Sequence, residues 1–120
     1  MTLIAHVAIL DDWESARNIG EYAVSTRGVP LDEAGCVRAI AVDDVDLVLE
    51  RRFADARFDL LLVILDTDEL TAGGLTVVEP APGRFELHGP IETDGAAVVH
   101  VLPIERSAAG YVVPDEPPGP

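Results

Sequence analysis

The sequence predicts a small α+β domain with two main helices, and three observations support this class. The chain has 120 residues, of which 48% are hydrophobic, so it suits one domain with a packed core. Strand-like segments dominate its second half, where they follow one another without a long helix between them. Neither G-x-G-x-x-G nor the P-loop pattern occurs, so Rossmann and P-loop folds lack their phosphate cradle here.

The first part of the chain is predicted to form a strand and then a helix. Residues 3–9 are apolar apart from His6, which indicates a buried strand. Asp11 and Glu14 have the spacing of a capping box at a helix start, and Gly20 ends that helix. We expect the next elements in this order: a short strand over 22–25, a loop over 26–30, a helical turn over 31–34 and a strand over 36–41.

Residues 43–53 carry the most complete helix pattern in the chain. Asp43 is the expected N-cap, and Arg51 and Arg52 suit the negative end of the helix dipole. Apolar side chains at helical spacing form one stripe that faces the core, namely Val45, Val48, Leu49 and Phe53.

The second half is predicted to consist of strands. Residues 60–65 read LLLVIL, and such an unbroken aliphatic run is typical of a central strand buried on both faces. Further strands are expected over 75–79 and 84–88, on either side of a Pro-Gly turn, and over 96–104. The domain is therefore assigned to residues 1–106, and the proline-rich residues 107–120 to a C-terminal tail on its surface.

The charge of the chain limits its partners. Twenty-two acidic residues stand against eight basic ones, all of them arginine, and the net charge is −14. Nucleic acids and anionic membranes are bound through basic surfaces, so neither is an expected partner. We expect a small-molecule ligand, anionic only if arginines cluster locally, and a possible homodimer through an exposed edge strand.

Other chemistry is excluded by what the sequence lacks. The N-terminus has no basic region before its short apolar run, and Cys36 is the single cysteine, so a cytoplasmic protein without an internal disulfide is expected. The three histidines have no short ligand spacing, which makes a zinc site improbable. No G-x-S-x-G motif occurs, and no cofactor is expected.

Two polar residues interrupt apolar strands, and each has two interpretations. His6 is either a core histidine bonded to backbone or a polar group that points into a cleft. Arg38 forms either a structural salt bridge or part of an anion site, because arginine is rarely buried without a counter-charge. Cys36, in the same apolar stretch as Arg38, is expected to be inert.

Further candidates lie in turns and at strand ends. The hydroxyl groups of Ser25 and Thr26, with the guanidinium of Arg27, suit a phosphate or carboxylate, although the same loop could be a solvated turn. His88 precedes Gly-Pro and is either a general base or a solvent-facing residue. Glu79 ends a strand and is either catalytic or merely solvated.

Several segments, taken in order, resemble the bacterial family of domains of unknown function called DUF952. The resemblance covers roughly residues 3–104. The segments that carry it are Ile4-Ala5-His6-Val7, Asp12-Trp13-Glu14, Gly20-Glu21-Tyr22, Ser25-Thr26-Arg27-Gly28, Leu31-Asp32-Glu33-Ala34-Gly35, residues 61–66, Glu79 and Gly89-Pro90-Ile91.

This resemblance implies an ADP-ribosyltransferase-like fold, in which a split β-sheet holds a nicotinamide dinucleotide in its cleft. His6 and the loop 25–27 would face that cleft. Two motifs depart from the family. Where the family usually reads Phe-Ile-His-x-Ser, this chain has Arg38 and Ile40 in place of the histidine and serine, and the motif Phe-Pro-His-Ile-Tyr-Gly-Pro is altered before Gly89. Such changes predict weakened binding of the old cofactor and a repurposed pocket.

The leading hypothesis is a small-molecule-binding domain that acts as a cofactor-independent cyclase, isomerase or hydrolase of specialised metabolism. In this hypothesis His88, Glu79 or His6 moves a proton, and Arg38 and Arg27 hold a developing oxyanion. Ser25, Thr26 and Tyr22 complete the predicted substrate site. The alternatives are an NAD-dependent ADP-ribosyl-type transferase and a non-catalytic binding or interaction protein.

Overall fold

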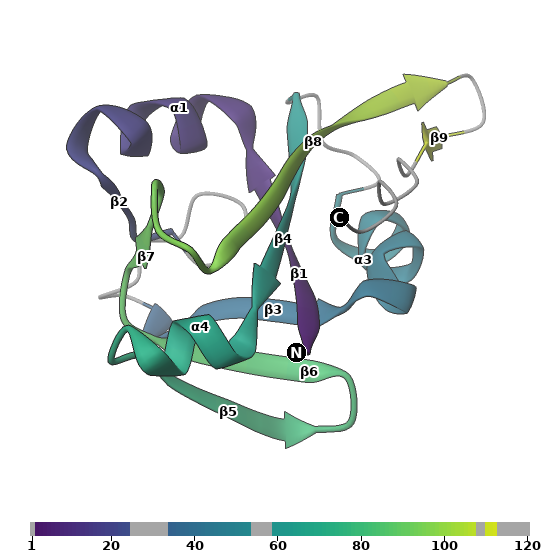
Figure 1. The fold of residues 1–120 in the computed structure, drawn as a ribbon. Helices are drawn as coiled ribbons and strands as arrows, with labels where there is room; N and C mark the ends of the chain where they lie inside the picture. The colour runs from purple at the N-terminus through teal and green to yellow at the C-terminus, as the bar shows by residue number, and fades with distance from the viewer. Residues whose placement is uncertain (1, 25–33, 54–58, 108–109, 113–120) are drawn as a thin grey trace.

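The structure is a computed structural model that describes residues 2–24, 34–53, 59–107 and 110–112 (Figure 1). Its strands pair antiparallel in the order β5-β6-β3-β1-β4-β8, and the short β9 (Gly110–Val112) pairs with the end of β8. The strands of this sheet are β1 (Leu3–Ile9), β3 (Val37–Ala41), β4 (Leu60–Asp66), β5 (Thr76–Ala81), β6 (Arg84–His88) and β8 (Val98–Ser107). A separate pair is formed by β2 (Glu21–Tyr22) and β7 (Ile91–Glu92). The predicted α+β class is confirmed.

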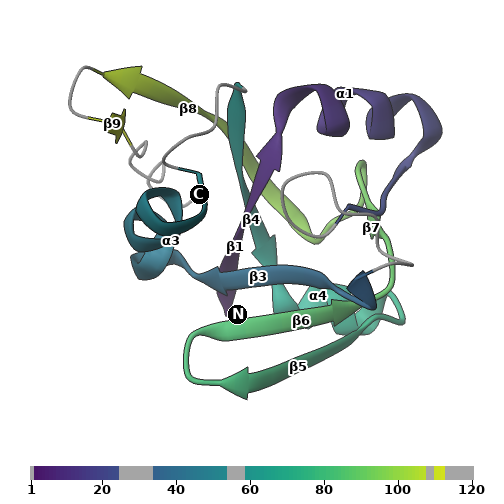
Figure 2. The same ribbon diagram turned by 180° about the vertical axis from the view of Figure 1, so that it is seen from behind.

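Helices cover both faces of the sheet, and each face has its own core. The helices α1 (Leu10–Ile19) and α4 (Thr67–Ala72) bury Trp13, Ala16 and Leu70 in one core. The 3-10 turn η1 (Val42–Asp44) leads into α3 (Val45–Arg52), which packs Val45 and Leu49 into the other core. Both ribbon views show α1 and α3 on opposite sides of the paired strands β1 and β4 (Figures 1 and 2).

The strands β1 and β4 form the centre of the fold. They pair along their whole length, from Leu3↔Asp66 to Ile9↔Leu60, and every residue of β4 is buried. Neighbouring strands and helices on both faces exclude water from β4, which explains its unbroken aliphatic run. The prediction of a central strand over 60–65 is confirmed.

On its other side β1 pairs with β3 for only two residues. The register includes Ile4↔Ala41 and Ala5↔Ile40 and then stops, while β3 continues to pair with β6 from Ile40 back to Val37. The strands β1 and β3 therefore separate beyond Ala5, and the sheet has an opening at this point.

Both predicted helix starts differ from the structure. The helix α1 begins at Leu10 after the N-cap Ile9, without a side-chain cap bond, so the capping box from Asp11 was wrong. Asp11 instead lies in the first turn, where a carboxylate favours the positive end of the helix dipole. Residues 42–44 form the 3-10 turn, so Asp43 is not the N-cap of the second helix. The end of α1 at Gly20, in the left-handed conformation with φ 97°, agrees with the prediction.

The second half contains elements that the sequence pattern did not predict. The helix α4 follows Asp66, whose side chain accepts a hydrogen bond of 2.9 Å from the Asp68 N–H, and no helix was predicted at this position. The strand β2 ends at Tyr22, and the short β7 was not predicted. The loop over 26–30 and most of the turn over 31–34 lie outside the described residues.

The C-terminal hairpin includes residues assigned to the tail. The strand β8 runs to Ser107, and β9 pairs Val112 with Glu105 and Tyr111 with Arg106. The Tyr111 hydroxyl donates a hydrogen bond of 3.0 Å to the Phe53 carbonyl at the end of α3. In the part of the chain described, no helix is both long and apolar enough to cross a membrane.

The hydrogen bond from Tyr111 to the Phe53 carbonyl joins the C-terminal hairpin to the domain. The variant Tyr111→Phe tests this role. The variant removes the donor to the Phe53 carbonyl, so we expect the free energy of unfolding to fall by about 1 kcal/mol. Urea unfolding of both proteins measures the difference. A chain that ends at residue 107 should lose at least as much stability, and unchanged stability in both variants would contradict this role of β9.

Candidate functional site

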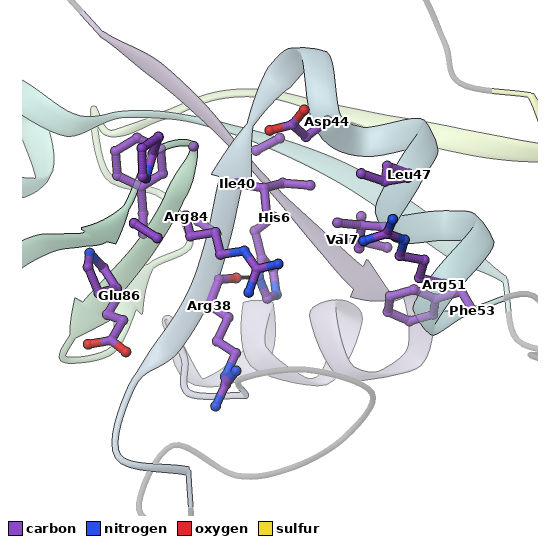
Figure 3. Close-up of a pocket in the computed structure, with 18 residues that line it drawn as sticks. His6, Val7, Arg38, Ile40, Asp44, Leu47, Arg51, Phe53, Arg84 and Glu86 are labelled. Carbon is purple, nitrogen blue, oxygen red and sulfur yellow. Dashed lines mark hydrogen bonds between the residues drawn. The ribbon is translucent and has the colours of Figure 1, made fainter.

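A cavity of about 560 Å³ lies where the opening between β1 and β3 meets α3 (Figure 3). One wall comes from the strands β3 and β6, and the opposite wall comes from η1 and α3. The end of β5 and the turn that follows it, together residues 80–83, form part of the rim. The cavity thus joins segments from both halves of the sequence.

Three arginines line this cavity from three different elements. Arg38 comes from β3, Arg84 from β6 and Arg51 from α3, and Figure 3 shows Arg51 across the cavity from the two strand residues. In the register, Arg38 lies opposite Glu86 and Arg84 lies opposite Ile40, so the two arginines are diagonal neighbours on one face. Among the described residues, no carboxylate oxygen lies within 4.0 Å of these guanidinium groups.

Two carboxylates also line the cavity, but neither neutralises this cluster by direct pairing. Asp44 lies in η1 and Glu86 in β6. The Glu86 Oε1 atom is 3.5 Å from the His88 Nε2 atom, so this carboxylate is directed along β6 toward His88. Three guanidinium groups against two carboxylates leave the lining with a positive balance, within a chain whose net charge is −14.

The remaining walls of the cavity are largely apolar. Val7 of β1, Val48 of α3 and Phe53 after α3 contribute hydrophobic surface, and Leu47 is 42% exposed. Binding sites for small organic molecules commonly combine apolar walls with a few polar groups that fix the orientation of the ligand. This cavity has that combination, with guanidinium groups as the main polar element.

His6 lies at the floor of the cavity, with both ring nitrogens bonded to protein. The side chain is 2% exposed, its Nδ1 atom is 2.7 Å from the Arg38 carbonyl oxygen, and its Nε2 atom is 2.8 Å from the Tyr22 hydroxyl. Because a carbonyl only accepts, we assign the hydrogen to Nδ1, and Nε2 accepts from the Tyr22 O–H. Burial lowers the pKa of His6 to about 4, so the ring is neutral at neutral pH.

Tyr22 belongs to the buried aromatic group behind His6. Its ring meets the His6 ring edge-on at a centroid distance of 5.3 Å and lies 5.0 Å from the Trp13 ring. Burial, with a smaller contribution from the nearby Asp12 carboxylate, raises the pKa of the Tyr22 hydroxyl, which therefore stays protonated. Tyr22 contacts His6 but is not part of the cavity lining.

The other predicted site residues take different positions. Glu79 accepts a hydrogen bond of 3.0 Å from the Gly83 N–H and so stabilises the turn at the rim. His88 is exposed on β6, paired with Glu86, and lies outside the lining. Ser25, Thr26 and Arg27 lie outside the described residues. The structure therefore brings His6 and Arg38 together at one cavity, without Glu79 or His88.

The rim turn is fixed to its surroundings at Gly83. The Gly83 carbonyl accepts a hydrogen bond of 2.9 Å from the Ala41 N–H, and Gly83 itself has a φ of 76°, which favours glycine. A Cβ atom at this position would lie 2.8 Å from the Asp44 Oδ2 atom. The turn and the Asp44 carboxylate are therefore in close contact at the edge of the cavity.

Sequence reasoning missed four charged residues of the cavity: Asp44, Arg51, Arg84 and Glu86. Arg51 was interpreted as a helix-dipole residue, and Arg84 and Glu86 as ordinary positions of a strand. Their alternation with the apolar Phe85 and Leu87 could have shown that they share one face of β6. The pairing of β6 with β3, which brings that face beside Arg38, has no local signal.

Neither a metal site nor a reactive thiol emerges from the described ranges. No group of three or more His, Cys, Asp or Glu side chains there is arranged to hold a metal ion. Cys36 is buried immediately before β3, and burial raises the pKa of its thiol above the usual value.

Comparison with known proteins identifies a fold relative but no family. No protein-family model matches the chain, and no curated protein sequence matches it. The crystal structure of the protein CC0527 from Caulobacter crescentus is similar, with a TM-score of 0.71, 19% sequence identity and 91% of each chain covered. A double-methionine variant of the same protein gives a TM-score of 0.70 at 18% identity over 91% of each chain. The similarity establishes a shared fold.

The buried His6 predicts a specific dependence of stability on pH. Its pKa is about 4 in the folded protein, against 6.5 for an ordinary histidine, so the unfolded state binds more protons between these values. The contribution of the neutral His6 ring to the free energy of unfolding is complete above pH 6.5. It is lost as the pH falls toward 4, and the free energy of unfolding then falls by up to about 1.4 kcal/mol per pH unit. Urea unfolding between about pH 7 and about pH 5 measures this slope.

Two variants isolate the effect of His6 from that of the carboxylates. His6→Gln removes the titrating group, so its unfolding free energy should fall less steeply with acidification than that of the wild type. His88→Gln is the matched control, because the His88 side chain is 43% exposed. Equal slopes in the wild type and in His6→Gln would show that His6 is not held neutral by burial.

Proposed function

We propose that this domain binds a small organic anion with an apolar body, in the cavity bounded by β3, β6 and α3. One observation carries the proposal: Arg38, Arg51 and Arg84 line one cavity from three different elements, and among the described residues no carboxylate oxygen lies within 4.0 Å of their guanidinium groups. The rest of the molecule is strongly acidic, with 22 carboxylate side chains in the sequence. All three arginines are exposed, so their side chains are accessible to a ligand, and they line the same cavity.

A bound anion would compensate the cost of this arrangement. Arg38 lies directly opposite Glu86 and diagonal to Arg84 on the paired strands, and Arg51 adds a third positive group, so the lining keeps a positive balance. An anion that binds the folded state would offset this positive balance and stabilise the domain by mass action. The planar guanidinium group suits both carboxylate and phosphate, because its N–H donors match two oxygens at once.

The size and walls of the cavity indicate the body of the ligand. A volume of about 560 Å³ lies within the usual range for small-molecule sites. Leu47, Val48 and Phe53 offer apolar surface on the helix side, opposite the strand arginines. We therefore expect a ligand with a carboxylate or phosphate group at one end and a ring or branched aliphatic group at the other.

The catalytic form of this proposal is a cofactor-independent cyclisation, isomerisation or hydrolysis. Arginines at the cavity would stabilise a developing oxyanion, and a carboxylate beside them would move a proton. Glu86 is a better candidate for that carboxylate than the predicted Glu79, because Glu86 lines the cavity. Its Oε1 atom also lies 3.5 Å from the His88 Nε2 atom. His88 would then act through Glu86, while His6, with both nitrogens bonded, would hold structure.

Membership in DUF952 and kinship with ADP-ribosyltransferases are part of this proposal. The ordered sequence segments support them, as does the opening between β1 and β3, which is the feature that a split sheet requires. NAD is the ligand that this kinship would favour. Titration of NAD in the same calorimeter tests the kinship, because binding of NAD in preference to the simple anions used below would favour the transferase alternative.

Isothermal titration calorimetry with phenyl phosphate and benzoate tests the proposal. Both probes combine an anionic group with a ring, and we expect saturable binding at millimolar concentration for at least one. Arg84→Ala and Arg51→Ala should each weaken that binding about ten-fold, because each removes a charge-assisted contact. Benzyl alcohol, which has the ring without the charge, should bind much more weakly.

Arg17→Ala is the charge-matched control for these variants. Arg17 lies on α1, away from the cavity, and its Nη1 atom is 3.6 Å from the Glu14 Oε2 atom. Its loss changes the net charge equally and should leave the affinity unchanged. Absence of binding by both probes, or an equal loss of affinity in Arg17→Ala and Arg84→Ala, would rule out an anion site at this cavity.

A further inference from the structure

We infer that His6 and Tyr22 form a positioning pair that holds the opening between β1 and β3 at a fixed width and so sets the place of Arg38 in the anion cavity. This inference rests on the proposed function of that cavity. It gives His6 a role that differs from proton transfer, because the ring acts through its hydrogen bonds to Arg38 and Tyr22.

The floor of the cavity coincides with the opening in the sheet. Pairing between β1 and β3 stops after Ala5↔Ile40. The residues that flank the opening on each strand all line the cavity, namely Ala5, His6 and Val7 on β1 and Arg38, Ala39 and Ile40 on β3. If the two strands paired further, these residues would close against each other and the floor would be lost.

The His6 ring occupies the place of the missing backbone pairing. An unbroken ladder would bring the backbone of β1 to the Arg38 carbonyl, which here accepts a hydrogen bond of 2.7 Å from the His6 Nδ1–H (Figure 3). The imidazole ring spans a greater distance than a direct backbone hydrogen bond between two strands. It therefore bridges the opening and also gives the Arg38 carbonyl a hydrogen-bond donor. The backbone of Arg38 is therefore fixed from the β1 side by His6 and from the other side by β6.

Tyr22 determines which way the His6 ring donates. Its hydroxyl lies 2.8 Å from the His6 Nε2 atom, in a buried position between His6 and Trp13. A hydroxyl that donates to Nε2 leaves the single ring hydrogen on Nδ1, where the Arg38 carbonyl requires it. One tautomer therefore satisfies all three groups, and the short strand β2 that carries Tyr22 is tied to the floor of the cavity.

Affinity measured beside stability tests this role. His6→Ala removes the bridge, and we expect about ten-fold weaker binding of the anionic probe that binds the wild type, at urea-free conditions where the variant is folded. Tyr22→Phe keeps the ring but loses the group that fixes its tautomer, so a smaller loss of about three-fold is expected. His6→Asn should recover part of the affinity, because its amide N–H₂ can reach the Arg38 carbonyl.

Leu70→Ala is the matched control for a merely structural effect. Leu70 is 4% exposed in α4, in the same core as Tyr22 but away from the cavity, so its truncation should lower stability without changing affinity. If His6→Ala and His6→Asn lower stability but bind the probe as the wild type does, the inference is overturned while the proposed function stands. If the wild type binds neither probe, the proposed function itself fails.

A spectroscopic measurement tests the pair without any ligand. Long-range ¹H–¹⁵N correlation of the imidazole nitrogens in the wild type should show a neutral ring protonated at Nδ1, and this pattern should weaken in Tyr22→Phe. The opposite tautomer, protonated at Nε2, could not donate to the Arg38 carbonyl and would overturn the proposed bridge, even if a His6 variant failed to fold.

Discussion

The pairing of β1 with β4 is the constraint on which the rest of the structure depends. These strands pair over their full length and are buried on both faces, so they leave little freedom in how the sheet continues. On the other edge of β1, only the first residues pair with β3, and β3 then turns away with β6. The cavity forms where these strands separate, and α3 covers the same face. The position of the candidate site thus follows from how far one strand pairs with its two neighbours.

The charge distribution gives this cavity a selectivity that its shape alone would not. A chain of net charge −14 repels extended polyanions, whose charges must approach much of the surface. A small anion that enters the cavity meets Arg38, Arg51 and Arg84 at short range, while the distant carboxylates are screened by salt beyond about 10 Å. The proposed site would therefore accept a compact anion in a protein whose overall charge disfavours nucleic acid. The sequence-based expectation of an anionic ligand depended on locally clustered arginines, and the binding itself stays a proposal.

Local patterns predicted the elements of the fold better than the site. The strands at 60–65 and 84–88 and the end of α1 at Gly20 follow from aliphatic runs, alternation and a left-handed cap, which are all properties of neighbouring residues. The helix α4 was missed because its six residues are too few for a periodic pattern, although Asp66 marks its start. His6 and Arg38 stood out as polar residues in apolar strands. Arg51 and Arg84 did not, because only the pairing of β3 with β6 and the packing of α3 bring them to Arg38.

His6 shows why the two sequence interpretations of a buried polar residue need not exclude each other. The ring is bonded to backbone, as a core histidine should be, and it also lies at the floor of a cavity, as a cleft residue should. An aliphatic side chain at this position would pack well, yet it would leave the Arg38 carbonyl and the Tyr22 hydroxyl without the bonds that His6 now makes. An unsatisfied buried polar group costs about 1–3 kcal/mol. With an aliphatic residue in place of His6, the Arg38 carbonyl would be satisfied only if β1 and β3 paired further, and that pairing would close the opening. A neutral ring with one donor and one acceptor stabilises the open arrangement, and with it the cavity that the three arginines line.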